Sequence, residues 1–570
     1  MYVKKIKQRN GTHYLHLVEA YRENKKIKHR KLESLGILEI LEKENPNILS
    51  ELKEKYKKQK SMKLFDGKYK EKNYGYFLLQ GIYESLGINR YLNNYQDNNL
   101  KIKYSLDEAM KLLVFSRILK PGSKLATFEH KEMFFDNFNI EINDLYRSLS
   151  IFNNIKEDLQ FDIHTNLSKK YGRDCTLVFY DVTNYYFEIH ENDMNQIDEQ
   201  GKKVEGFRKN GMGKDGKRQP LVVMGLVMDN NNIPVAYQLF KGNEADTKTL
   251  IPIFQSITKK YNLKKIVLVG DKGINSENNL NFMVNEGNGY IVSQKARGQT
   301  EEFTKEILRQ DNYLDDNEDF KYKSIERERI LKCEEDRTKD VKIKEKVVFI
   351  WSKKYHDRMQ HKRKKELEKI KYFIKNQKQL VKLEKDLKPY IIEKIKDKSG
   401  KKIKDAQIEY EFDEAKFKEA CELDGYYILI SSETYLTECE IRQKYKGLLE
   451  IENCFRILKS DFEGRPVYVW SKSRIEGHFL ICFIALTIMR ILQKLLHNQY
   501  SVAKLQDAIN SAKLHPIKKD YFIFAESKVF DEILKVLNLD VSETELSLGN
   551  FLKYKKQFTL LQKNLRFNGY

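Results

Sequence analysis

The sequence predicts an α/β protein, α+β overall, built around one mixed β-sheet. Between residues 175 and 295, short apolar runs typical of buried strands alternate with helical patterns. The hydrophobic content of 41% is enough for globular domains. At 570 residues the chain is too long for a single core, so several domains are expected around this sheet.

The elements of the predicted core follow a definite order. The first is an apolar strand, CTLVFYD, and the second is a hairpin turned at DNNN. Two helix–strand units come next, so the order predicts antiparallel strands followed by parallel crossovers. A ribonuclease-H-like mixed sheet has this order. The six expected elements are a strand at 175–181, the hairpin at 220–240, a helix at 243–261, a strand at 264–271, a helix at 276–287 and a strand at 289–295.

Charge and composition narrow the class of protein. Lys and Arg number 104 against 83 for Asp and Glu, which gives a formal charge of +21 and favours a polyanionic partner, most simply nucleic acid. The six cysteines are scattered without a C-x-x-C pair, which argues against structural zinc and a disulfide framework. The start lacks a signal peptide, and the longest apolar run, 479–489, is too short to span a bilayer. We therefore expect a soluble intracellular protein that does not bind membranes.

The flanking segments predict further modules. Residues 2–35 form short basic strands with an RNGT turn, and 105–119 is an amphipathic helix that opens on a Ser cap and stops at Pro121. After 295 comes a very basic stretch that contains a long helix, either an inserted domain or a solvated helical spacer. The expected parts are a small basic β module (1–60), a helical DNA-binding module (61–172), the first part of the core (173–295), a basic insertion domain (296–425), the second part of the core (426–500) and a C-terminal region (501–570).

A glycine-rich segment, GMGKDGKR at 211–218, matches G-x-G-x-x-G and nearly matches a P-loop. It runs into a strand, so no helix N-terminus is available to hold phosphate. We therefore interpret it as a basic connection that lies along a DNA backbone through Lys214, Lys217 and Arg218.

Two aspartates follow apolar strands. Asp181 comes after LVFY and Asp271 comes after VLVG. A lone aspartate at such a place more often starts a turn or caps a helix. The functional interpretation therefore needs a third acid nearby.

A helix at 445–462 supplies the third acid. Its apolar stripe leaves Tyr445, Glu452 and Lys459, spaced by seven, on one line at the margin of the core, with Arg456 close by. Glu–Arg pairing on a surface helix accounts for Glu452 and Arg456 but not for the other two residues. The stripe consists of Leu448, Ile451, Phe455, Leu458 and Phe462.

Three carboxylates on two strands and a helix suit one chemistry particularly well. Two Mg²⁺ ions, or Mn²⁺ ions, take oxygen ligands and, held about 3.5–4 Å apart, assist in-line phosphoryl displacement. We expect Asp181, Asp271 and Glu452 to meet in one cluster, and to repel one another when no cation is bound. Bound metal would explain why an aspartate interrupts a buried strand.

The motifs YDVT and GDKG, with the Tyr445–Leu448–Glu452–Lys459 spacing, resemble the DDE transposases of bacterial insertion sequences, in the IS-four superfamily. The resemblance covers roughly residues 105–295 and 425–495. It implies that the three acids are catalytic and bind two metal ions, and that the Tyr and Lys contact phosphate near the cleaved end. The superfamily has Arg where this chain has Leu448, and we expect Arg456 to stand in for it.

The resemblance implies a transposase that cuts DNA at the ends of its element and joins the 3′ hydroxyl to target DNA. Its partners would be double-stranded terminal inverted repeats and target, bound by a homodimer on paired ends. It would work in the bacterial cytoplasm, at the nucleoid. Alternatives are a ribonuclease-H-like nuclease or resolvase without a joining step, and a degenerate transposase retained as a DNA-binding protein. We also expect Trp351, in the insertion, to stack on an unpaired base; an ordinary core tryptophan is the other interpretation.

Overall fold

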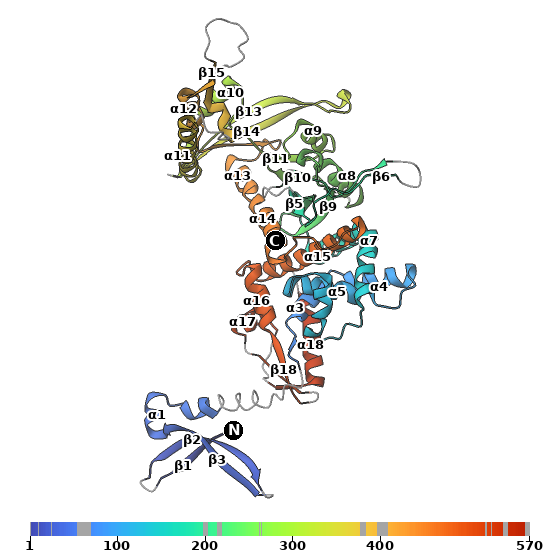
Figure 1. Cartoon of the computed structure of the whole chain (residues 1–570), viewed down its shortest axis with the longest axis vertical. Helices are drawn as coiled ribbons and strands as arrows, with labels where there is room; N and C mark the ends of the chain where they lie inside the picture. The colour runs from blue at the N-terminus through green and yellow to red at the C-terminus, as the bar shows by residue number, and fades with distance from the viewer. Residues whose placement is uncertain are drawn as a thin grey trace. The chain divides into compact units, whose positions relative to one another are not determined.

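The structure is a computed structural model (Figure 1). It describes residues 2–8, 11–23, 26–53, 70–197, 203–211, 213, 219–261, 263, 265–317, 319–376, 384–395, 408–518, 521–525, 527–539 and 545–564. The chain divides into two compact units. Unit 1 comprises Met1–Tyr171, Asp461–Glu463 and Ser473–Tyr570, and unit 2 comprises Gly172–Ser460 and Gly464–Lys472.

Unit 2 is built on a nine-stranded mixed sheet of order β12-β13-β14-β17-β11-β10-β5-β8-β9. The central strands β5, β10 and β11 are parallel, and β8 and β9 continue the sheet antiparallel from β5. The strands are β5 (Leu177–Tyr186), β8 (Leu221–Asp229), β9 (Pro234–Lys241), β10 (Val267–Gly270), β11 (Gly289–Gln294), β12 (Leu314–Asn317), β13 (Phe320–Leu331), β14 (Val341–Ser352) and β17 (Tyr426–Ser431).

The core elements lie where the sequence predicts them. The hairpin is β8–β9, and the crossover helices are α8 (Leu250–Tyr261) and α9 (Glu277–Asn285). All nine residues of β8 are buried, as expected for a strand covered on both faces. The two faces of β5 are distinguished by neighbouring side chains: the buried Tyr180 hydroxyl donates to Thr249 Oγ1 at 2.7 Å, so Tyr180 points to the α8 side and Phe179 to the opposite side.

The segment after 295, which the sequence predicts to be a basic insertion domain, contributes strands to the core sheet. Its strands β12, β13 and β14 extend the same sheet, because β14 pairs with β17 and β17 pairs with β11. A buried carboxylate fixes this extension: Glu345 of β14 accepts from the Tyr290 hydroxyl at 2.5 Å and from Arg327 Nε at 2.8 Å. The alternating charges of β13 suit a strand with one solvated face, which sequence patterning did not separate from the charged helix that follows.

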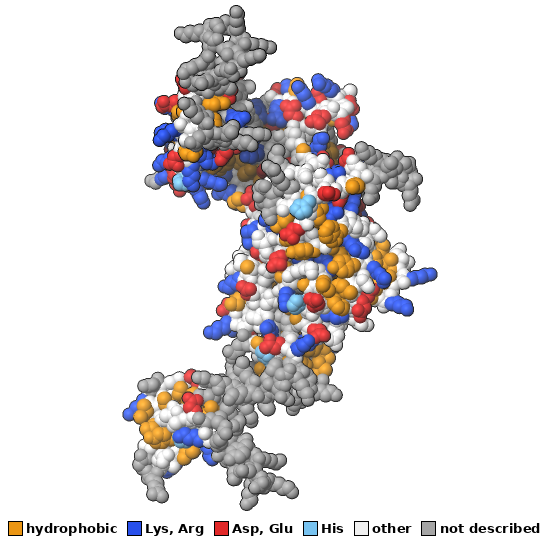
Figure 2. Space-filling model, in the orientation of Figure 1, with side chains coloured by type: hydrophobic (Ala, Val, Ile, Leu, Met, Phe, Trp, Pro, Cys, Tyr) orange, Lys and Arg blue, Asp and Glu red, His pale blue; other side chains and the backbone are white. Residues whose placement is uncertain are grey.

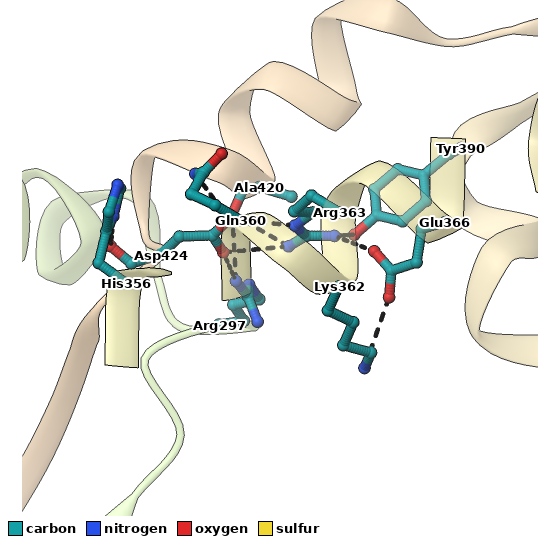
Figure 3. Close-up of polar contacts among 9 residues, drawn as sticks. All are labelled: Arg297, His356, Gln360, Lys362, Arg363, Glu366, Tyr390, Ala420 and Asp424. Carbon is teal, nitrogen blue, oxygen red and sulfur yellow. Dashed lines mark hydrogen bonds and ion pairs between the residues drawn. The ribbon is translucent and has the colours of Figure 1, made fainter. Parts of the chain in front are cut away.

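That basic helix, α11 (Lys353–Lys375), is anchored by one buried arginine. Arg363 donates to Asp424 at 3.2 Å, to the Tyr390 hydroxyl at 3.2 Å and to Glu366 at 2.8 Å, and Arg297 also pairs with Asp424 (Figure 3). Since a buried charge is tolerated only when it is paired, this network fixes the position of α11. The neighbouring elements are α10 (Glu301–Leu308), β15 (Ile391–Ile395), β16 (Ile408–Phe412) and α12 (Glu414–Glu422), and a separate short hairpin pairs β6 (Gln196–Ile197) with β7 (Lys203–Val204).

Unit 1 contains the predicted N-terminal sheet and the helical module. The sheet is the antiparallel β1 (Tyr2–Lys7), β2 (His13–Glu23) and β3 (Lys26–Ile37), followed by α1 (Leu38–Glu44). Ser105 caps α5, as predicted, by accepting from the Glu108 amide at 3.1 Å. The helices are α3 (Tyr76–Ser85), α4 (Ile88–Asn99), α5 (Leu106–Leu119), α6 (Lys124–Glu129), α7 (Ile142–Tyr171), α15 (Lys472–Leu495), α16 (Val502–Ser511), α17 (Lys528–Val536) and α18 (Leu548–Asn564), and a small sheet of order β20-β19-β18-β4 joins β20 (Glu545–Ser547), β19 (Tyr521–Phe524), β18 (Lys513–Lys518) and β4 (Lys72–Asn73).

Among the described helices, α15 alone is long and apolar enough to cross a membrane. Its apolar window is entirely buried inside the protein, as in the core helix of a soluble protein. The expectation of a buried helix is confirmed, but α15 extends well beyond residues 479–489, so the expectation that it is too short to span a bilayer is wrong.

Candidate acidic site beside β5 and β10

Asp181 lies within β5 and not at its end. The sequence predicts that the strand stops at this aspartate, but β5 continues to Tyr186 because its whole length, from Val178 on, pairs with β8. Only the first part, up to Tyr180, also pairs with β10. Asp181 is therefore the first residue beyond the parallel pairing, and its Oδ1 accepts from the Val182 amide at 2.7 Å.

Asp271 occupies the matching place on the neighbouring strand. Gly270, the last residue of β10, is the register partner of Tyr180, so Asp181 and Asp271 both come one residue after the same pair. Neighbouring strands lie about 4.8 Å apart. Asp271 Oδ1 also accepts from the Gly273 amide at 2.6 Å, which holds the turn that follows β10.

Two short helices carry the third acid. The sequence predicts one helix over 445–462, but the structure has α13 (Glu438–Lys446), α14 (Leu448–Arg456) and a π-helical turn at Ile457–Asp461. A capping box between Thr437 and Glu440 starts α13. The five residues of the predicted apolar stripe are all buried, as expected. Glu452 is exposed on α14.

Gly447, between the two helices, allows them to approach β5 closely. A Cβ at this position would lie 2.3 Å from Phe179 Cζ, so only glycine fits against that ring. Phe179 and Asp181 are two residues apart on a strand, and their side chains therefore project from the same face. Asp181 thus faces the side of the sheet on which α13 and α14 lie.

Tyr445 of α13 lies in an electrostatic environment to which all three acids contribute. Burial, together with the negative charges of Asp271, Glu452 and Asp181, raises the pKa of Tyr445 to about 12, although a hydrogen bond with Ser293 opposes the shift. Residues separated by 90 and 181 positions in the chain therefore act on one side chain.

The three acids do not close on a common point. Among the described residues, no three His, Cys, Asp or Glu side chains lie close enough together to hold a metal ion. The donor set itself, three carboxylates and no nitrogen or sulfur, fits a hard divalent cation such as Mg²⁺ or Mn²⁺.

Of the predicted phosphate contacts, Tyr445 lies on α13, Arg456 ends α14 and Lys459 lies in the π-helical turn that follows. Arg456 is exposed and donates to Asn453 Oδ1 at 3.0 Å, and Lys459 Nζ lies 6.0 Å from the ring centroid of Tyr185. The break at Gly447 and the π-helical turn mean that Tyr445 and Lys459 do not share one continuous helix with Glu452. Leu448 is buried in the apolar stripe, so its side chain does not take part in the charged surface.

The other predicted DNA contacts have different outcomes. Lys214, Lys217 and Arg218 lie outside the described residues. Trp351 is half-buried in β14, with its ring centroid 5.7 Å from that of His356. A Cβ on Gly425 would lie 2.6 Å from Trp351 Nε1, so the indole is packed against backbone.

Two residues of the site were not predicted from the sequence. Ser293 forms a hydrogen bond with Tyr445, and Gly447 lets α14 pack closely on β5. An isolated glycine within a helical pattern is a signal that could have identified Gly447, since such a glycine commonly has a packing reason. Ser293 carried no such signal.

Comparison with known proteins assigns the family. Residues 3–64 match the N-terminal domain of the IS1634 family transposases. Residues 189–488, more than half of the chain, match the transposase DDE domain, a segment that includes Asp271 and Glu452 and begins just after β5. The chain therefore belongs to the DDE transposases, and it is an enzyme of transposition related to those of IS1634 insertion sequences.

The solved structures it resembles are also transposases. A synaptic complex of piggyBac transposase with hairpin DNA aligns with a TM-score of 0.35 at 8% identity, over 78% of this chain and 82% of that one. The Mos1 mariner paired-end complex with Mn aligns with a TM-score of 0.11 at 11% identity, over 34% and 62%. No curated protein matches significantly. The assignment therefore depends on the two domain matches.

Proposed function

We propose that Asp181, Asp271 and Glu452 are the catalytic acids of this transposase and that they hold two divalent ions, Mg²⁺ or Mn²⁺. The observation that carries the proposal is the register of β5 and β10, which puts Asp181 and Asp271 at matching places on adjacent strands, with the helix of Glu452 packed on β5 at Gly447. The order β9-β8-β5-β10-β11, with β5, β10 and β11 parallel, further supports a ribonuclease-H-like core.

Within this proposal each acid has its own place. We assign Asp181 the central place, because it neighbours Asp271 across the sheet and belongs to the face of β5 that α14 approaches at Gly447. It would bridge both ions, while Asp271 and Glu452 would each complete one. The ions would stabilise the attacking and leaving oxygens of an in-line displacement at phosphorus.

The reaction has two displacements at one site. Water first attacks the phosphodiester at the element end and releases a 3′ hydroxyl. That hydroxyl then attacks a phosphodiester of the target, and the target strand leaves as its own 3′ oxygen. Tyr445, Arg456 and Lys459 would contact the phosphates beside the cut, while the basic modules, including Lys214, Lys217 and Arg218, bind the terminal inverted repeats and target as a homodimer on paired ends.

The test is strand cleavage by isosteric single variants. Asp181→Asn, Asp271→Asn and Glu452→Gln should each lose cleavage of end-containing DNA in Mg²⁺ or Mn²⁺. Their binding to that DNA should stay within about threefold of wild type, because phosphate contacts from other surfaces supply the affinity.

The matched control is Glu450→Gln, two residues from Glu452 on the same helix, which should cut normally. Near-normal cutting by any one of the three variants would remove that residue from the site. Cutting without joining by the wild-type protein would favour the nuclease alternative.

A further inference from the structure

The segment that follows the π-helical turn reverses the usual burial pattern. Val467 and Val469 are buried, at 6% and 4% exposed, while Tyr468 and Trp470 are exposed, at 56% and 64%. Alternation of this kind is typical of an extended chain lying on a core. Large aromatic side chains gain more from burial than valine does, so exposing them in preference to valine indicates a surface built to bind something.

The indole of Trp470 packs against the guanidinium of Arg208, which is itself fixed by an ion pair with Asp193. Arg208 Cζ lies 5.6 Å from the Trp470 ring centroid and 5.4 Å from that of Phe187. Asp193 holds the guanidinium with an Nη2–Oδ1 distance of 2.6 Å. One face of the indole therefore rests on Arg208, while most of the side chain is open to solvent.

Further cations border these aromatics. Arg465 Cζ lies 5.9 Å from the ring centroid of Tyr186, and Lys472 Nζ lies 5.2 Å from that of Phe207. The Val467 amide donates to the Tyr186 carbonyl at 3.4 Å, which ties the segment to the end of β5. Tyr186 is five residues beyond Asp181 on that strand, or roughly 17 Å at about 3.3 Å per residue.

We propose that Tyr468, Trp470, Arg208, Arg465 and Lys472 form a platform that binds unpaired nucleotides of the DNA strand beside the cleavage site. Bases stack on exposed aromatic rings whatever their sequence, and bordering cations contact the phosphates. Residues two apart on an extended chain are about 6.7 Å apart. Tyr468 and Trp470 are therefore close enough to contact the same nucleotide or two neighbouring nucleotides of one strand.

A paired duplex does not fit this surface, because its bases already stack on one another. The assignment also moves the stacking role from the half-buried Trp351 to Trp470. It rests on the proposed function only in that the site of cleavage is taken to be at Asp181, Asp271 and Glu452.

Fluorescence tests the platform directly, because the chain has only two tryptophans. Trp351→Phe leaves Trp470 as the sole tryptophan, and Trp470→Phe leaves Trp351. Each full-length variant is titrated, without divalent ions, with blunt end-containing duplex and with the same duplex carrying an unpaired extension on either strand. We expect the extension, and not the blunt duplex, to quench Trp470 in the Trp351→Phe protein. Equal quenching by blunt duplex, or quenching only in the Trp470→Phe protein, would overturn the proposal.

Affinity provides the second measurement. Trp470→Ala should weaken binding of the extended duplex by about 5- to 100-fold and leave blunt-duplex binding unchanged. Trp470→Phe should keep most of the preference for the extension. Tyr435→Ala, which removes a 73%-exposed tyrosine elsewhere in unit 2, is the control and should bind both duplexes as wild type does.

An unchanged preference for the extension in Trp470→Ala would refute the platform. So would a change of oligomeric state with that preference intact, which would make the surface a protein interface. Binding is measured without metal, so it does not depend on the cleavage assay. Normal cleavage by the variants of the three acids would therefore not affect the evidence for the platform, and a negative binding result would not affect the assignment of the acids.

Discussion

At the scale of single residues, Lys124 is an amine held inside an apolar core. It is 4% exposed on α6, and its Nζ lies 3.2 Å from His478 Nδ1. His478 Nε2 in turn lies 3.8 Å from Cys482 Sγ on the same helix, α15. Burial and the nearby Arg117 lower the pKa of Lys124 to about 7, against the smaller opposite effect of Cys482. The amine is therefore about half charged near pH 7 and largely uncharged above it, whereas in the unfolded chain it is charged up to about pH 10.4.

This depressed pKa predicts the pH dependence of stability. Between pH 7 and about 10 the unfolded chain binds more protons at Lys124 than the folded protein does, so the contribution to the free energy of unfolding rises with pH. Below pH 7 the amine is charged in both states, so the destabilisation by the buried charge is complete and no longer changes with pH. Relative to wild type, Lys124→Met should gain stability as the pH falls from 10 to 7, by on the order of a few kcal/mol.

The measurement is urea unfolding at several pH values, with the exposed Lys120→Met on the same module as control. The difference in unfolding free energy between Lys120→Met and wild type should stay flat across this range. A flat difference for Lys124→Met as well would mean that Lys124 titrates in the folded protein as it does in the unfolded chain.

Residue identities were predictable to different degrees. Asp181 and Asp271 stand out because each interrupts or ends an apolar run, and Glu452 stands out because it borders an apolar stripe. The solvent exposure of each side chain could not be predicted, because it depends on which strands and segments pack together, and no local sequence pattern contains that information. That is why Trp351, which β14 buries halfway, was expected to stack on a base, while the Val–Tyr–Val–Trp alternation that ends at Trp470 went unused.

At the scale of elements, the position of α14 depends on Gly447. Gly447→Ala would bring a Cβ to 2.3 Å from Phe179 Cζ, so the helix or the ring must move. Overpacking of this kind costs about 1–3 kcal/mol. The better helix propensity of alanine returns at most about 1 kcal/mol. We therefore expect lower stability and a larger fall in cleavage, since α14 carries Glu452.

Cleavage of end-containing DNA and urea unfolding check this expectation together. The double variant Gly447→Ala/Phe179→Leu should recover part of the cleavage, because the smaller side chain makes room. Gly549→Ala, at a helical glycine with nothing within 4 Å of the added Cβ, is the control and should be neutral or stabilising. Full activity of Gly447→Ala would show that the close approach is not needed.

Element order was easier to predict than sheet membership. The strand, hairpin and two crossover units from β5 to β11 follow from apolar runs and helical periods, and each lies where expected. The extension by β12, β13, β14 and β17 could not be predicted, because an antiparallel partner is chosen by side-chain packing between segments far apart in the chain. The break at Gly447 was missed because hydrophobic periodicity continues across it.

At the scale of the whole molecule, the charge of +21 is partly concentrated on particular surfaces. In unit 2, Lys and Arg side chains gather over α11 (Figure 2). One exposed face of that helix repeats every three to four residues and presents Lys354, Arg358, His361 and Lys365, while Met359, Arg363 and Ile370 are buried on the other face. A cationic helix face of this kind suits a phosphate backbone.

DNA binding by the whole chain should therefore depend steeply on salt. Each phosphate neutralised releases counterions, which gives a slope of about −0.9 in log K against log salt. With six or more contacts, the binding constant should fall about a thousandfold or more between 50 and 200 mM salt. Arg358→Ala/Lys365→Ala should make the slope shallower by about one to two and weaken binding to all sequences alike.

The matched control is Lys305→Ala/Lys418→Ala, which removes two exposed lysines that each pair with an acid of their own helix and should leave the slope unchanged. Gel-shift titrations across this salt range decide the matter: a flat dependence would contradict a phosphate-dominated interface, and equal slopes for both double variants would exclude the α11 face from it.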